Sequence, residues 1–161
     1  MLEIRKALPE DNEAIWHIIE EVISKGDTYT FAPDSSKEVM LNYWCGEDKH
    51  TYVATDNEKI VSTFFIKDNQ PGLGSHIANA GYMVAGKAWG KGIGKTIGEF
   101  SLEEAKRLGY RAMQFNIVVK SNARAVHLWQ KLGFSIIGEI PDAFNHKENG
   151  FTNAYIMYRI L

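Results

Sequence analysis

The sequence has little cysteine, little proline and no long apolar run. Its single cysteine, Cys45, excludes an internal disulfide framework and fits a reducing compartment. No apolar stretch reaches the length of a membrane span, and residues 1–6 lack the pattern of a signal peptide. A net charge of −2 argues against nucleic acid or an anionic membrane as the main partner. We therefore expect one cytoplasmic domain over residues 1–161, with neither nucleic-acid nor membrane partners.

Three glycines recur at alternate positions between an expected strand and an expected helix: Gly90, Gly92 and Gly94. They follow the apolar stretch 76–84 and open a helix over residues 93–108. A helix N-terminus without side chains lets an anion approach its unpaired N–H groups, and the helix dipole favours negative charge there. Lys91 and Lys95 add positive charge. The pattern predicts a cradle for phosphate or pyrophosphate.

Two familiar glycine-rich phosphate loops do not fit this stretch. A P-loop requires glycine at position 89, where Trp89 stands, and the dinucleotide fingerprint requires glycine at position 95, where Lys95 stands. The acyl-CoA loop, Gln/Arg-x-x-Gly-x-Gly/Ala, fits residues 92–94, with Trp89 in place of its Gln or Arg. A glycine-rich turn without a ligand is the alternative.

The hydrophobic pattern predicts strands and helices in the order β-α-α-β-β-β-α-β-α-β-β. Strands are expected at residues 2–7, 51–55, 60–66, 76–84, 112–119, 134–140 and 152–160. Helices are expected at residues 9–24, 35–44, 93–108 and 121–132. This order indicates an α/β (α+β) fold with a mixed sheet and helices on both faces.

That order, with the glycine loop after the fourth strand, resembles the GNAT superfamily of acyl-CoA-dependent N-acyltransferases. Residues 122–134 are similar to the superfamily's Asn-x-x-Ala-x-x-Leu-Tyr-x-x-x-Gly-Phe segment. The resemblance covers the whole chain. It implies a mostly antiparallel sheet of about six or seven strands, splayed between the fourth and fifth. It also implies acetyl-CoA as co-substrate, and no spacing of His, Cys and carboxylates suggests a metal.

Several segments also resemble a branch of small-molecule acetyltransferases within this superfamily. The branch includes yeast enzymes that act on toxic proline analogues such as azetidine-2-carboxylate, and their bacterial relatives. The similar segments are residues 69–72, 76–82, 115–116 and 141–146. The branch implies a small-molecule amine as acceptor, either an amino acid or an amino-acid-like toxin.

The resemblance assigns acetyl-CoA to the glycine loop and its neighbours. The backbone of Met83 and Val84 would bond to the pantetheine arm as an added strand does. The amides of residues 90–95 would hold the pyrophosphate, and Asn122 would bond to the arm where the sheet splays. The implied donor-site residues are Met83, Val84, Trp89, Gly90, Lys91, Gly92, Ile93, Gly94, Lys95 and Asn122.

Three residues are candidates for the chemistry: Asn116, His76 and Trp129. Trp129 stands where many members have a tyrosine that protonates the departing thiolate. An indole does not titrate usefully, so Trp129 either positions the sulfur or packs in the core. Asn116 is expected to be buried in an apolar strand, where it either orients the amine or bonds to neighbouring backbone. His76 is a base or proton relay, or else it is structural and water carries the proton.

Four residues are expected near the acceptor: Tyr29, Phe31, Asn79 and His146. Tyr29 and Phe31 lie on the early loop that, by resemblance, covers the acceptor pocket, or they simply pack that loop. Strand alternation places Asn79 on the face opposite to His76, unless a bulge intervenes. His146 either lines the mouth of the pocket or is a surface histidine.

These residues together indicate acetyl transfer from acetyl-CoA to a small amine by direct attack. The first alternative is an enzyme that acetylates a protein N-terminus or lysine. The second is a domain that binds acyl-CoA as a sensor without turnover. An exposed edge strand near the C-terminus would suit a homodimer.

Overall fold

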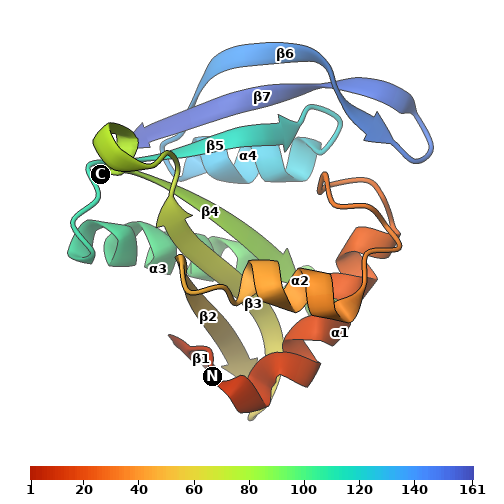
Figure 1. Ribbon diagram of the computed structural model, residues 1–161, viewed down its shortest axis with the longest axis vertical. Coiled ribbons are helices and arrows are strands. Elements are labelled where there is room, and N and C mark those ends of the chain that lie inside the picture. Colours follow the sequence, from red (N-terminus) through yellow and green to blue (C-terminus); the bar gives the residue numbers. More distant parts are fainter.

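The computed structural model describes residues 1–161 and is built on one seven-stranded sheet (Figure 1). The spatial order of its strands is β1-β2-β3-β4-β5-β7-β6. The strands are β1 (Leu2–Lys6), β2 (Lys49–Asp56), β3 (Lys59–Asp68), β4 (Ile77–Val84), β5 (Ala112–Val119), β6 (Ser135–His146) and β7 (Gly150–Ile160). The α-helices are α1 (Asn12–Ser24), α2 (Lys37–Trp44), α3 (Ile93–Arg107) and α4 (Ala123–Lys131). Short 3-10 turns are η1 (Pro9–Asp11), η2 (Gly72–Gly74) and η3 (Gly86–Ala88).

Local sequence signals set several helix ends. The Ser36 hydroxyl accepts from the Val39 N–H at 3.2 Å and starts α2, as the capping pattern predicts. Asn122 caps α4 in the same way, since its side-chain oxygen accepts from the Ala125 N–H at 3.3 Å. Gly109, with φ of +94°, follows the end of α3. None of the helices is long and apolar enough to cross a membrane.

The sheet separates between its fourth and fifth strands. All neighbouring strands pair antiparallel except β4 and β5, which run parallel and pair only at Ile77–Ala112 and Ala78–Met113. Beyond these two pairs β4 and β5 diverge (Figure 1). The predicted mixed, mostly antiparallel and splayed sheet is therefore confirmed.

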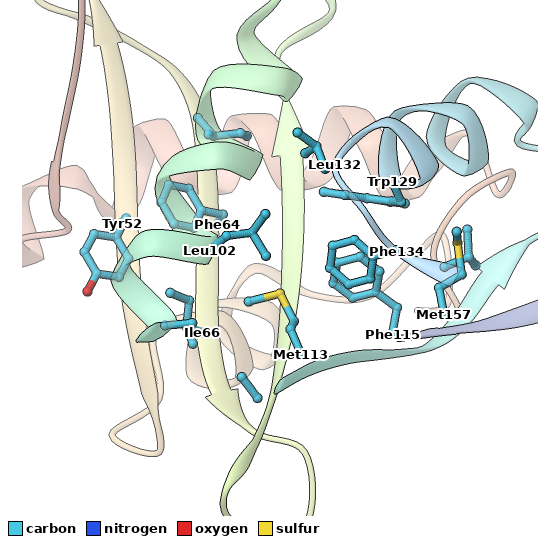
Figure 2. Close-up of a cluster of buried hydrophobic side chains, with 14 of the residues drawn as sticks. Tyr52, Phe64, Ile66, Leu102, Met113, Phe115, Trp129, Leu132, Phe134 and Met157 are labelled. Carbon is cyan, nitrogen blue, oxygen red and sulfur yellow. The ribbon is translucent and has the colours of Figure 1, made fainter. Parts of the chain in front are cut away.

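Helices cover both faces of the sheet, and each face has its own apolar core. The larger core joins α3 and α4 to β2, β3, β4, β5 and β7, with Trp129, Phe115 and Phe134 close together beside Met157 (Figure 2). The second core joins α1 and α2 to the other face of the sheet. Four isoleucines of α1 fill it at helical spacing: Ile15, Ile18, Ile19 and Ile23.

The C-terminal hairpin is longer than the expected strands. The strand predicted at residues 134–140 continues as β6 to His146, because pairing with β7 resumes at Phe144–Thr152 after a register shift. The unpaired residues of this shift, 141–143, begin with Pro141, which has no N–H for the ladder. The hairpin tip reaches the loop between α1 and α2, where the Lys147 N–H donates to the Gly26 carbonyl at 3.0 Å.

Candidate active site

One edge of β4 is paired and the other is mostly open. The Ala85 N–H donates to the Val61 carbonyl of β3, so the odd-numbered residues of this stretch present their backbone to β3. The even-numbered residues therefore face β5. Because pairing with β5 stops at Ala78, the N–H and C=O groups of Tyr82 and Val84 point into the gap between the two strands.

Met83 is a correction to the expected donor site. Its backbone faces β3, since its carbonyl accepts from the Ser62 hydroxyl at 2.9 Å and its register partner is Thr63. Its side chain is buried in the α1–α2 core. The open edge belongs to Tyr82 and Val84, because backbone groups alternate along a strand.

A cavity of about 330 Å³ occupies the gap between β4 and β5. Its walls come from the end of α1, the α1–α2 loop, α2, β3, β4, β5 and the start of α4. Most of the lining is apolar or aromatic. The polar residues other than tyrosines that line it are Thr28, Thr30, Asn79, Asn116 and Asn122. No carboxylate, imidazole, thiol or lysine is among its lining residues.

The glycine loop ends in an open helix N-terminus. Gly90 and Gly92 have φ of +79° and +74°, a conformation that side chains disfavour, and a Cβ at either position would meet no atom within 4 Å. Gly92 caps α3 without a side-chain bond, and the first helical bond runs from the Thr96 N–H to the Gly92 carbonyl at 3.1 Å. No oxygen of the chain accepts from the N–H groups of residues 93–95. The amides of Ile93, Gly94 and Lys95 can therefore hold an anion.

Residues at the C-terminal end of helix α1 hold the segment between β4 and the glycine loop. Both carboxylate oxygens of Glu21 accept from the Gly86 N–H, at 3.1 and 3.2 Å. The Lys25 ammonium lies 4.2 Å from the centre of the Trp89 ring, whose indole N–H donates to the Val84 carbonyl at 3.0 Å. No local sequence pattern predicts the contact of Glu21 with Gly86, because the two residues are 65 positions apart. Lys91 and Lys95 are exposed beside the loop.

Trp129 lies where the core meets the cavity. It is 8% exposed and packs against Tyr82 and Phe115, with ring centres 4.8 and 4.7 Å away, while it also lines the cavity. Core packing is thus established for Trp129. Contact with the sulfur of a bound thioester stays a prediction.

An amide cluster borders the cavity on the α1–α2 face. Asn116 is exposed rather than buried, because the β5–β7 register shifts between Phe115 and Val118 and forms a bulge there. Its side chain donates to Asn69 at 2.7 Å and accepts from Gln114 at 3.0 Å. Asn116 therefore makes hydrogen bonds to side chains, whereas one of the two sequence-based expectations was hydrogen bonds to neighbouring backbone groups.

Asn79 joins the two splayed strands. Its side-chain amide donates to the Gln114 carbonyl of β5 at 2.9 Å. Ala78 lies in the larger core, and Ala80 and Tyr82 pack against that core. The Asn79 side chain points to the opposite face of the sheet, as strand alternation predicts. The cavity thus brings Asn79 and Asn116 together with the expected aromatic residues of the α1–α2 loop.

The two histidine candidates lie outside the cavity. His76 is exposed and precedes β4, at the end where the strands still pair, and its carbonyl accepts from the Arg111 N–H at 2.9 Å. At about 3.3 Å per strand residue, His76 lies roughly 20 Å from Tyr82. Strand alternation predicts on which face of the sheet a side chain lies, but it does not predict how far along the strand the residue is from the cavity. The structure therefore does not support His76 as a base or relay.

His146 is buried rather than at the surface or the mouth of the pocket. It is 9% exposed, and its Nδ1 accepts from the N–H groups of Glu148 and Asn149, both at 3.1 Å. It closes the turn between β6 and β7 and does not line the cavity. The sequence could not predict this role, because it depends on the extended hairpin.

Tyr29 and Phe31 line the cavity from the α1–α2 loop. Their rings stack with centres 5.9 Å apart, and Phe31 also meets the edge of Tyr43 at 5.2 Å. The Tyr29 hydroxyl donates to the Tyr82 carbonyl at 2.6 Å and accepts from the Tyr82 N–H at 2.7 Å. Burial raises the pKa of the Tyr29 phenol and also that of the Tyr82 phenol, so both stay protonated near neutral pH.

The splayed sheet, the cavity in its gap and the open helix N-terminus after β4 agree with the architecture that the resemblance to the GNAT superfamily implies. Residues 15–134 match the model of the acetyltransferase (GNAT) family, and the chain belongs to this family. No three His, Cys, Asp or Glu side chains come close enough together to hold a metal ion.

Individual relatives agree with this assignment. The chain is 38% identical over 98 residues to the N-acetyltransferase aca1 of Schizosaccharomyces pombe, a match that covers 60% of this chain and 47% of that protein. The matched segment thus spans about half of the yeast relative. A GCN5-related N-acetyltransferase from Kribbella flavida superimposes with a TM-score of 0.94 at 38% identity, over 99% of this chain and 98% of that one. An acetyltransferase structure from Salmonella typhimurium shares the fold, with a TM-score of 0.88 at 19% identity, over 100% of this chain and 94% of that one.

Proposed function

We propose that this protein transfers an acetyl group from acetyl-CoA to the amine of a small molecule, either an amino acid or an amino-acid-like toxin. The observation that carries the proposal is the cavity itself. It joins the open edge of β4 to a pocket of aromatic and amide side chains on the α1–α2 face, and it reaches Trp89 in the loop that leads to the free amides of α3. Such a passage lets a donor and an acceptor meet in one complex.

The residues present fit acetyl-CoA. The N–H groups of residues 93–95, with Lys91 and Lys95 nearby, would hold the pyrophosphate. The backbone of Tyr82 and Val84, which β5 leaves unpaired, would pair with the pantetheine arm as an added strand. Asn122 keeps its side-chain N–H₂ for the arm, because only its oxygen is used in capping α4. The acetyl-CoA seen in the Salmonella typhimurium structure supports this donor.

The chain's own groups would guide the transfer. When bound, acetyl-CoA supplies the activated acyl group. The Tyr82 N–H, once released from the Tyr29 hydroxyl, would polarise the thioester carbonyl, which favours attack by a neutral amine nitrogen on the carbonyl carbon. A C–N bond then forms, the C–S bond breaks and CoA leaves as the thiolate. The amine proton goes to water, since no carboxylate or imidazole lines the cavity.

The acceptor would bind on the α1–α2 face. Tyr29, Phe31 and Tyr43 offer aromatic surface there, and Asn79 and Asn116 offer amide groups without net charge. A compact molecule with one apolar part and a few polar groups suits such a pocket. The resemblance of the Asn79 and Asn116 segments to the proline-analogue acetyltransferases supports an amino-acid-like acceptor.

A thiol-release assay tests the proposal. Acetyl-CoA is incubated with the protein and a panel of amino acids, cyclic and toxic analogues, polyamines and short peptides. We expect saturable release of free CoA with one class of small amines, and mass spectrometry should find that amine acetylated. Release only with peptides would favour a protein acceptor. Acetyl-CoA binding without any release would favour a sensor, and no binding would contradict the donor site.

A further inference from the structure

The hydroxyl of Tyr29 occupies both backbone groups of Tyr82 at the open edge of β4. It accepts from the Tyr82 N–H at 2.7 Å and donates to the Tyr82 carbonyl at 2.6 Å. These two residues lie 53 positions apart in the sequence. In a complete sheet, a neighbouring strand would satisfy this pair of groups. A phenol from the α1–α2 loop therefore takes the place of a strand.

The surroundings hold this phenol in position. The Tyr29 ring stacks on Phe31 and meets the edge of Trp44 at 6.2 Å. Trp44 is fully buried, and its indole N–H donates to the Thr63 hydroxyl at 2.9 Å. The phenol is thus fixed by packing on one side and by two hydrogen bonds at its tip.

We propose that Tyr29 is a built-in competitor for the thioester site, which acetyl-CoA must displace from Tyr82 in order to bind. The proposal rests on the proposed function, because it takes acetyl-CoA as the ligand that pairs with the open edge of β4. A thioester carbonyl that accepts from the Tyr82 N–H needs the position that the hydroxyl oxygen holds. One N–H group cannot make a good hydrogen bond to both oxygens at once.

Displacement of Tyr29 also links the two substrates. Tyr29 stacks on Phe31, and Phe31 contacts Tyr43 in the acceptor pocket. Movement of the phenol away from β4 therefore changes the lining of that pocket. The free energy that holds Tyr29 on Tyr82 lowers the affinity for acetyl-CoA, and it couples donor binding to the shape of the acceptor site.

The variant Tyr29→Phe tests the proposal, because it removes the hydroxyl and keeps the ring. Isothermal titration with acetyl-CoA should show a Kd about five- to tenfold lower than that of the wild type, since no hydrogen bonds have to be released. Adenosine 3′,5′-bisphosphate, which lacks the pantetheine arm and the thioester, should bind with unchanged affinity. The free variant should have a lower Tm than the free wild type, while the two acetyl-CoA complexes should melt alike.

Tyr110→Phe is the matched control. The Tyr110 hydroxyl donates to Asp68 at 2.7 Å, outside the cavity. This variant should lose Tm equally in the free and the bound protein, with the same Kd for acetyl-CoA. Equal or weaker binding of acetyl-CoA by Tyr29→Phe would overturn the inference. Failure of the wild type itself to bind acetyl-CoA would overturn the proposed function, and this inference with it.

Discussion

Gly92 serves the fold and the proposed anion site at once. Its φ of +74° lets the chain turn from the loop into α3, and its missing side chain leaves the helix N-terminus accessible. The sequence predicted this loop well, because glycine spacing and helix periodicity are local signals. It did not predict that Met83 faces β3, since that depends on pairing with a distant strand.

Gly92→Asp should abolish acetyl-CoA binding. A carboxylate would enter the space meant for the pyrophosphate, and the positive φ adds a strain of about 1 kcal/mol. Gly109→Asp is the matched control, because Gly109 also has a positive φ and open space, at the other end of α3. Titration calorimetry compares the two variants. Micromolar binding retained by Gly92→Asp would disprove this placement of the pyrophosphate.

Asn116→Ala should lower the catalytic efficiency with the acceptor amine and leave the binding of acetyl-CoA unchanged. We expect kcat/KM for the acceptor to fall about tenfold, as for one lost hydrogen bond in a polar site, with an unchanged Kd for acetyl-CoA. Asn153→Ala is the control, since Asn153 bonds to Glu139 and Asp142 away from the cavity. Steady-state kinetics measure both variants. Turnover equal to that of Asn153→Ala would make Asn116 purely structural.

At the scale of elements, Asp11 ties β1 to the start of α1. Its carboxylate accepts from both guanidinium nitrogens of Arg5, at 2.7 and 2.9 Å, and from the Leu8 N–H at 2.7 Å. The Arg5 guanidinium holds the pKa of Asp11 below its ordinary value of 3.8. Helix periodicity predicted α1, but no sequence pattern predicted the ion pair between Asp11 and Arg5 of β1.

Asp11→Asn should lower the free energy of unfolding at pH 7 by about 2 kcal/mol, as expected for charged hydrogen bonds. Because folding lowers the pKa of Asp11, the carboxylate stabilises the fold fully above pH 3.8 and progressively less as the pH falls through the lowered value. Urea unfolding at pH 7 and at acidic pH should show this difference shrinking. The control Glu139→Gln, at an exposed ion pair, should change stability little. An equal loss in both variants would contradict the account.

At the scale of the whole molecule, the order of elements predicted a mixed sheet with helices on both faces, and the resemblance to the GNAT superfamily added the splay between the fourth and fifth strands. The contacts that complete the site were not predictable, because they join distant segments. Glu21 reaches Gly86 across 65 residues, and Tyr29 reaches Tyr82 across 53. Neither contact follows a periodic pattern. The extended β6–β7 hairpin, which meets the α1–α2 loop at Gly26, was also longer than its sequence pattern suggested.

Amide NMR of this 18.2 kDa protein tests the central claim most directly, namely that the donor site runs from the start of α3 to the open edge of β4. On addition of acetyl-CoA, we expect the largest shift changes at the amides of residues 90–95 and at Tyr82. The chain has a second cavity of about 350 Å³, which Lys6, Cys45 and Lys49 help to line. Shift changes confined to that cavity, with residues 90–95 unaffected, would contradict the account.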